Sequence, residues 1–223
     1  MNEDTLQRSI GYCFKNTGLL RRALTHRSFA AEHNERLEFL GDSVVNCIIA
    51  QVLYEKFPEL PEGELSRLRA SLVSETALAG LAGHMALGVA LFLGEGELKS
   101  GGQQRPSILS DALEAVVGAA FVDGGFDAAR QTVIHVFGPS LDAIDPATSG
   151  KDAKTVLQEF LQGKHLPLPC YTVIAIHGDA HDQRFEVECF IASLNIRGNG
   201  VGTSRRRAEQ EAARMACGQV MCQ

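Results

Sequence analysis

The stretch ERLEFLGDS, residues 35–43, carries three carboxylates at spacings of three and four. At about 100° per residue, Glu35, Glu38 and Asp42 fall within about 60° of one face of a helix. The helix expected over residues 35–57 is otherwise largely apolar on every side, which is typical of a buried helix. Carboxylates are almost never buried unless they are paired or bind a metal. The stretch therefore predicts a buried helix whose row of acids needs a partner.

A second expected helix, residues 108–122, repeats this arrangement. It is apolar except for Ser110, Asp111 and Glu114. Two such helices together favour a divalent-cation site; the alternative is that the acids pair with Arg36 or lie at solvated helix ends. All candidate ligands are carboxylates, which suit magnesium, calcium or manganese. Magnesium keeps several waters in such sites, so the pattern favours metal-assisted hydrolysis of a phosphate ester.

A glycine, Gly41, interrupts the first of these helices. Glycine costs about 1 kcal/mol relative to alanine in a helix interior, so its presence calls for a structural reason. We expect the missing side chain to let another backbone pass close to Asp42.

Residues 35–43 resemble the nine-residue signature of bacterial ribonuclease III, without a departure. Three other segments resemble the same family: ALTHRS at 23–28, PEGELSR at 61–67 and DALEA at 111–115. The likeness covers nearly the whole chain. It implies an all-α ribonuclease III endonuclease domain and assigns a role to each matching acid.

The roles that the resemblance implies fall into three groups. The metal ligands are Glu38, Asp111 and Glu114; the catalytic acids are Asp42 and Glu114; Glu35 and Glu62 have secondary roles. The resemblance also implies an endoribonuclease that depends on Mg²⁺, with Mn²⁺ as a substitute, and that cleaves double-stranded RNA. Products would have 5′-phosphate and 3′-hydroxyl ends with a short 3′ overhang. A homodimer in which each subunit cuts one strand is implied, with rRNA, mRNA and tRNA precursors as expected substrates.

The composition agrees with a soluble protein of 223 residues, 45% of them hydrophobic. No apolar run approaches the ~18 residues needed to cross a membrane, and the start, MNEDT, lacks the features of a signal peptide. The six cysteines form no CxxC pair and are expected to be reduced packing residues. We therefore expect a cytoplasmic protein with no membrane partner and no zinc.

Two domains are expected, joined near DPATSG at residues 145–150, where Pro, Thr, Ser and Gly indicate a linker. We assign residues 1–145 to the catalytic domain, with its core at about 3–125, residues 146–151 to the linker and residues 152–222 to a second domain. Helices are expected in the first domain over residues 19–29, 35–57, 62–74, 75–87, 108–122 and 126–142.

The pattern changes after the linker. A helix is expected over residues 154–164, strands over 171–176, 184–191 and 195–200, and a final helix over 204–220. This order is α-β-β-β-α, typical of an α+β domain. The charge also changes: residues 1–150 hold 12 basic and 19 acidic residues, whereas residues 151–223 hold 9 and 8, within a net charge of −6.

Three arginines, Arg205, Arg206 and Arg207, follow Ser204 at the start of the last helix. Cations there oppose the helix dipole by about 0.3–1 kcal/mol each, unless an anion binds to the helix start. Nucleic-acid phosphate is the expected anion; the alternative is a solvated basic turn. Together with the α-β-β-β-α order, this turn makes residues 152–222 resemble a double-stranded-RNA-binding domain.

That resemblance implies two further RNA contacts. One is from the first helix, through Gln158, Glu159 and Gln162, and the other is from the loop 178–181 with His181. Both would reach minor grooves, where A-form RNA displays its 2′-hydroxyls. Glu209 departs from the pattern, because many members have a lysine there, and this predicts a modest affinity.

Two other functions compete with this interpretation. A catalytically silent double-stranded-RNA-binding protein would lack one of the core acids, and none is missing. An all-helical isoprenoid synthase would need a DDxxD-type run, which does not occur, and would leave the C-terminal domain unexplained. The glycine-rich segment 94–102 lacks the GxxxxGK[ST] spacing, so no nucleotide cofactor is expected and a mobile loop is favoured there.

Overall fold

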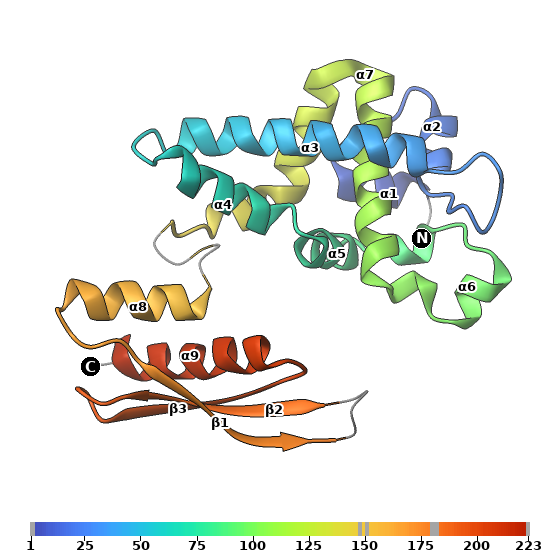
Figure 1. The fold of residues 1–223 in the computed structure, drawn as a ribbon. Coiled ribbons are helices and arrows are strands. Elements are labelled where there is room, and N and C mark those ends of the chain that lie inside the picture. The colour runs from blue at the N-terminus through green and yellow to red at the C-terminus, as the bar shows by residue number, and fades with distance from the viewer. Residues whose placement is uncertain (1–2, 147–148, 150–151, 179–182, 222–223) are drawn as a thin grey trace. The chain divides into compact units, whose positions relative to one another are not determined.

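The computed structural model describes residues 3–146, 149, 152–178 and 183–221. The chain forms two compact units, Met1–Ser149 and Gly150–Gln223 (Figure 1). Across its described residues, the first unit consists of helices, short 3₁₀ turns and one isolated bridge. The second combines helices with a three-stranded sheet. The expected succession of an all-α domain and an α+β domain is confirmed.

The helical unit is built around two long helices. Its elements are α1 (Glu3–Ile10), α2 (Thr17–Ala23), α3 (Glu35–Lys56), α4 (Glu62–Leu72), α5 (Glu75–His84), η1 (Leu87–Ala90), α6 (Glu95–Lys99), η2 (Gly102–Gln104) and α7 (Pro106–Asp142). Helices α3 and α7 cross at the centre of the unit (Figure 1). Their fully buried side chains, such as Ile48, Leu53, Leu113 and Val116, form the core.

Helix α2 ends at Ala23, six residues before the end expected for it. The reason is a long-range contact. Phe92 N donates to Leu24 O at 2.9 Å, and His26 N donates to Phe92 O at 3.0 Å. These bonds use backbone groups that a continued helix would need, so residues 24–34 cross the surface as a turn-rich segment.

Three further expectations need correction. Helix α1 was not among the expected helices. The glycine-rich segment 94–102 contains α6 and not only a loop. The helices expected over 108–122 and 126–142 are joined in α7, which bends at Gly125, whose φ of +76° lies in the region that glycine adopts readily.

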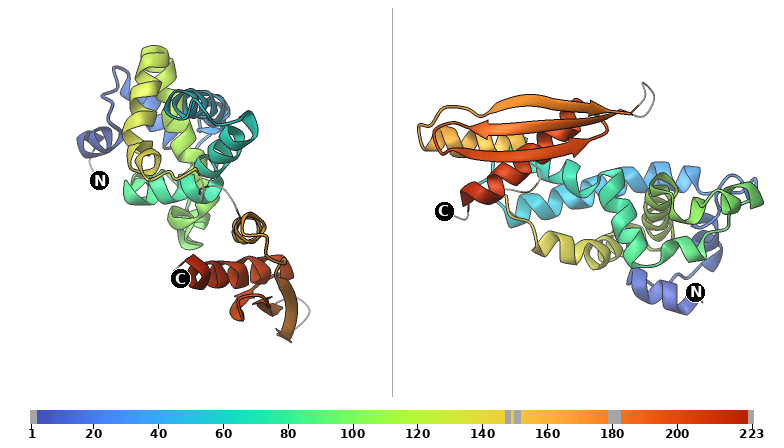
Figure 2. Two further views of the ribbon diagram at one scale, coloured as in Figure 1. Left: turned by 90° about the vertical axis from the view of Figure 1, so that its left-hand side faces the viewer. Right: turned by 90° about the horizontal axis from the view of Figure 1, so that it is seen from below.

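The second unit contains α8 (Ala153–Gly163), β1 (Cys170–His177), β2 (Arg184–Ile191), β3 (Ile196–Gly202) and α9 (Arg205–Met221). The strands are antiparallel in the order β1-β2-β3, and both helices lie on one face of the sheet (Figures 1 and 2). Close contact between β3 and α9 requires glycine. A Cβ on Gly200 would lie 2.2 Å from the backbone nitrogen of Ala212.

Two expectations from composition can be compared with the structure. Among the described helices, only α3 is long and apolar enough to cross a membrane, and its buried face belongs to the core of the helical unit. Of the described cysteines, Cys189 is buried and Cys217 partly buried, but Cys13, Cys47 and Cys170 are exposed, and none is in a disulfide. The packing interpretation is therefore wrong for the three exposed cysteines.

Candidate active site and RNA-binding surface

Three carboxylates meet where α3 crosses α7. One oxygen from each of Glu38, Asp111 and Glu114 lies within 4.8 Å of the other two. Asp111 and Glu114 are successive residues on one face of α7, and Glu38 faces them from α3. All three side chains are partly buried. The sequence predicted these three ligands, and the fold brings them together.

The electrostatics of this cluster favour a bound cation. Burial and the charges of Asp42, Asp111 and Glu38 raise the pKa of Glu114 to about 8. Burial is also the largest cause that raises the pKa of Glu38 and that of Asp111. A divalent cation would relieve the repulsion among the three carboxylates, and their all-oxygen donor set suits a hard ion such as magnesium. The residues present therefore fit such an ion.

Asp42 lies one turn along α3 from Glu38 and is exposed. Asn46 Nδ2 donates to Asp42 Oδ1 at 2.8 Å, which fixes the orientation of the carboxylate. The charge of Asp42 is the largest charge effect on Glu114. Asp42 is thus beside the three-residue cluster and outside it.

The two secondary acids lie in different places. Glu35 accepts from Arg27 Nη1 at 3.2 Å at the start of α3. Glu62, at the start of α4, accepts from Ser66 Oγ at 2.7 Å and lines a separate hollow with Tyr54 and Arg69. Within the described residues of the chain, Glu62 does not contribute to the carboxylate cluster.

The predicted RNA-binding residues of the second unit lie on α8 and at the start of α9. Gln158 and Gln162 are exposed and one turn apart on α8. Ser204 Oγ accepts from the backbone nitrogen of Arg207 at 3.3 Å, as a helix cap does. His181 lies outside the residues that the structure describes.

The three arginines of the turn are not equivalent. Glu209 accepts from Arg205 Nε at 2.9 Å and from Lys154 Nζ at 2.7 Å, so the acid ties α8 to α9 and partly neutralises Arg205. Arg207 Nη1 donates to Thr203 Oγ1 at 3.3 Å.

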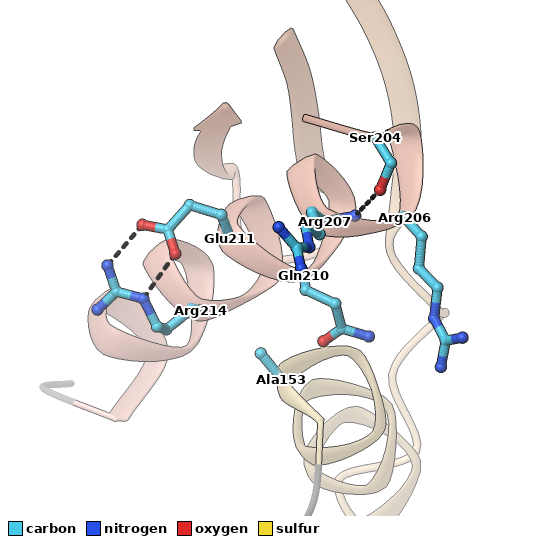
Figure 3. Close-up of a pocket in the computed structure, with 7 residues that line it drawn as sticks. All are labelled: Ala153, Ser204, Arg206, Arg207, Gln210, Glu211 and Arg214. Atoms are coloured by element: carbon cyan, nitrogen blue, oxygen red, sulfur yellow. Dashed lines mark hydrogen bonds and ion pairs between the residues drawn. The ribbon is translucent and has the colours of Figure 1, made fainter. Parts of the chain in front are cut away.

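Arg206 is on the rim of a hollow of about 510 Å³ at the starts of α8 and α9. Figure 3 shows its guanidinium pointing away from the Glu211–Arg214 pair. In the described part of the chain, no ion pair or hydrogen bond engages the Arg206 side chain, so this arginine is the most available of the three for a phosphate.

Comparisons with known proteins match both units of the chain. The family model described as Ribonuclease-III-like matches residues 16–141, and the one described as Double-stranded RNA binding motif matches residues 153–220. The protein named Ribonuclease 3 from Ralstonia pickettii is 59% identical over 97% of this chain and 84% of its own length. The protein named Ribonuclease 3 from Thiobacillus denitrificans is 58% identical over 96% of this chain and 95% of its own length.

The chain belongs to the ribonuclease III family. It is an endoribonuclease of the ribonuclease III type, which excludes the isoprenoid synthase alternative. The solved nuclease domain of ribonuclease III from Campylobacter jejuni is 42% identical and superposes with a TM-score of 0.62. The match covers 65% of this chain and 99% of that domain. A second structure of that domain, with a TM-score of 0.60, is described for flexibility in a region involved in dimer formation.

A hollow beside the carboxylate cluster of this ribonuclease III is lined by further residues, some of which the sequence analysis did not select as site residues. Its volume is about 390 Å³, and its walls include Glu38 and Asp111. Arg27 and Arg105 lie on its rim, and Arg105 Nη1 donates to Glu97 Oε2 at 2.8 Å. The only sequence signal for Arg27 was its place in the ALTHRS segment, because its contacts are made across the fold.

The two histidines near the site are hydrogen-bonded. His26 Nδ1 accepts from the backbone nitrogen of Ser28 at 3.2 Å, so the neutral ring carries its proton on Nε2. His33 Nδ1 accepts from the backbone nitrogen of Glu35 at 3.4 Å. Both arrangements favour a structural role for these rings over that of a general base.

Proposed function

We propose that the chain hydrolyses phosphodiester bonds of double-stranded RNA with Mg²⁺, which Mn²⁺ can replace. Glu38, Asp111 and Glu114 would hold the ion. The observation that carries this proposal is the meeting of their oxygens within 4.8 Å between α3 and α7. When bound, the ion supplies Lewis-acid polarisation of the phosphate and lowers the pKa of a bound water.

The remaining chemistry belongs to the chain. Without the metal, the carboxyl group of Glu114 holds a proton near neutral pH, because its pKa is about 8, and that proton must leave when the ion binds. Asp42, oriented by Asn46 and open to solvent, is positioned to orient the attacking water and to accept its proton. The products would be 5′-phosphate and 3′-hydroxyl ends with a short 3′ overhang.

The proposal includes a homodimer in which each subunit cuts one strand. Two large hydrophobic side chains on α3 support it, because Phe39 is 79% exposed and Tyr54 is 72% exposed. Both side chains lie on the same long helix, and a solved nuclease domain from Campylobacter jejuni is described for a region involved in dimer formation. We place the enzyme in the cytoplasm, with rRNA, mRNA and tRNA precursors as substrates.

The experiment that tests the proposed function is incubation of purified protein with long duplex RNA, with and without Mg²⁺. Glu114→Gln and Asp42→Asn should each abolish cleavage and leave duplex binding intact. Ca²⁺ should permit binding without turnover, because it tolerates looser geometry. Glu55→Gln is the matched control: it removes an exposed acid from α3 far along the helix and should cleave normally. Full activity of either site variant would contradict the assignment.

A further inference from the structure

Arg27 lies on the rim of the hollow that the metal ligands Glu38 and Asp111 help to line. Its Nη1 is 3.2 Å from Glu35 Oε1, and the two side chains are 71% and 48% exposed. The second carboxylate oxygen of Glu35 is 3.8 Å from His33 Nδ1. One oxygen of Glu35 therefore faces the Arg27 guanidinium, the other lies near a His33 nitrogen that accepts from the Glu35 backbone, and neither belongs to the three-carboxylate cluster found among the described residues.

The backbone on both sides of Arg27 is fixed by contacts with a distant segment. His26 N donates to Phe92 O at 3.0 Å, and Gly94 N donates to Ser28 Oγ at 2.9 Å. The Ser28 and His26 side chains also contact each other at 2.8 Å. The backbone of Arg27 is thus fixed, whereas its guanidinium remains exposed to solvent. This combination suits a side chain that binds a ligand.

The chemistry of the pair sets what that ligand is. A guanidinium cannot bind a metal ion. Next to unpaired carboxylates, it would compete with a metal ion for those carboxylates. Arg27 forms its ion pair with Glu35, while its charge acts on Glu38 and Asp111 from a longer distance and opposes the rise in their pKa values. Exposed ion pairs contribute little to stability, so this pair opens readily. A phosphate group, which accepts two parallel hydrogen bonds from arginine, is a stronger partner.

We infer that Arg27 binds the phosphate adjacent to the scissile one on the RNA strand, and that Glu35 is a positioning residue that acts through Arg27 and does not bind the metal. The inference rests on the proposed function, since the ligands beside the hollow define where the strand enters. Arg27 would fix the strand relative to the cluster, so its loss slows cleavage of bound RNA more than it weakens binding.

A double-mutant cycle tests both parts on the full chain. Single-turnover cleavage rates at saturating enzyme are compared for the wild type, Arg27→Met, Glu35→Gln and the double variant. The cleavage rate of Arg27→Met should be about 10- to 100-fold lower than that of the wild type. This is the change in rate expected when one charge-assisted hydrogen bond to the RNA is lost. Glu35→Gln should lose less. The double variant should be no slower than Arg27→Met, because Glu35 acts only through the arginine.

Two further variants separate this role from a structural one. Arg27→Lys keeps the charge without the planar fork and should recover part of the rate. Arg8→Met, which removes an exposed arginine from α1, should cleave at the wild-type rate. Arg27→Ala should regain activity with millimolar ethylguanidinium and regain less with ethylammonium. A wild-type rate for Arg27→Met, or an absence of rescue, would overturn the inference.

Readouts that do not depend on turnover complete the test. With Ca²⁺ in place of Mg²⁺, Arg27→Met should reduce the slope of log affinity against log salt by about 0.9, which corresponds to one phosphate contact. The Mg²⁺ midpoint should be unchanged in Glu35→Gln and raised in Glu38→Gln. A raised midpoint in Glu35→Gln would make it a ligand and refute its positioning role. If the wild type shows no Mg²⁺-dependent cleavage, the proposed function fails, whereas the salt slope still reports on the phosphate contact.

Discussion

The backbone carbonyl of Glu114 lies directly against the Cα of Gly41. A Cβ at residue 41 would be 1.8 Å from that oxygen, a distance that two non-bonded heavy atoms cannot adopt. The relationship is reciprocal one turn away, where a Cβ at Gly118 would be 2.1 Å from the carbonyl oxygen of Leu37. The two helices that carry the proposed metal ligands therefore approach closely beside these residues, and this closeness sets the spacing between Glu38 and Glu114.

Gly41→Ala should consequently separate α3 from α7. We expect a loss of about 1–3 kcal/mol in the free energy of unfolding from overpacking, with a larger relative loss of cleavage because the ligands move apart. Thermal unfolding and Mg²⁺ titration calorimetry would measure the two effects. Gly80→Ala is the matched control, since no atom lies within 4 Å of its Cβ in α5, and it should gain about 0.5–1 kcal/mol. Wild-type metal affinity in Gly41→Ala would contradict this account.

The raised pKa of Glu114 makes metal binding depend on pH. The ion needs a deprotonated carboxylate, so Mg²⁺ affinity should rise with pH until about 8, the pKa of Glu114 without metal. Calorimetry at pH 7 in two buffers of different ionisation enthalpy should show close to one proton released per ion bound. At pH 9 the release should vanish. A constant affinity from pH 6 to pH 9 would be inconsistent with the burial of Glu114 among acids.

The same group affects the stability of the metal-free protein. Folding raises the pKa of Glu114 from 4.5 to about 8. The protonated carboxyl group therefore contributes to the free energy of unfolding fully below about pH 4.5, and this contribution is lost as the pH rises to about 8. Because the carboxyl group is partly exposed, we expect about 1–2 kcal/mol, less than the full linkage value. Glu114→Gln should flatten this decline in metal-free thermal unfolding curves. Equal pH dependence in both proteins would show that another group is responsible.

The sequence was sufficient to predict the cluster because its signal is local. Helical spacing put Glu38 with Glu35 and Asp42 on one helix face and Asp111 with Glu114 on another, and apolar surroundings indicated that both helices are buried. The resemblance to ribonuclease III then selected Glu38, Asp111 and Glu114 as the ligands. The expectation that Gly41 admits a second backbone is confirmed, and that backbone is the one that carries Glu114.

Features that depend on long-range contacts could not be predicted in the same way. The end of α2 and the pairing of Arg27 with Glu35 depend on segment 92–94, more than sixty positions along the chain. A further case is Asp123, which accepts from Tyr12 and from the backbone of residues 15 and 16, more than a hundred positions away. No period or motif encodes such contacts.

The proposed homodimer can be tested through Phe39, one of the exposed aromatic residues of α3. Light scattering should give about twice the chain mass of 24.1 kDa at micromolar protein. Phe39→Asp should shift the protein toward the monomer, because a charge replaces a side chain that is 79% exposed in the single chain. Val89→Asp, at another exposed hydrophobic position, should remain a dimer. Heterodimers of wild type and Glu114→Gln should nick only one strand; a monomer that makes double-strand breaks would refute the model.

The arginine turn offers a final prediction that separates its members. Among the described residues, Arg206 forms no close ion pair and only interacts with the charge of Asp152 at longer range, whereas Arg205 is bonded to Glu209. Arg206→Ala should therefore weaken duplex RNA binding about equally across unrelated sequences and reduce the slope of log affinity against log salt by about 0.9. Arg205→Ala should reduce the slope less, because its charge is already partly neutralised.

Filter binding or fluorescence anisotropy over a range of salt concentrations would measure these slopes. Arg197→Ala is the control, since that arginine is on β3 and pairs with Glu188 on the sheet. At low salt, cleavage by Arg206→Ala should largely recover, because the carboxylate cluster is untouched. Unchanged affinity and slope would make the turn a solvated basic surface. Loss of binding to one RNA sequence with another spared would show that the turn reads bases and does not clamp phosphates.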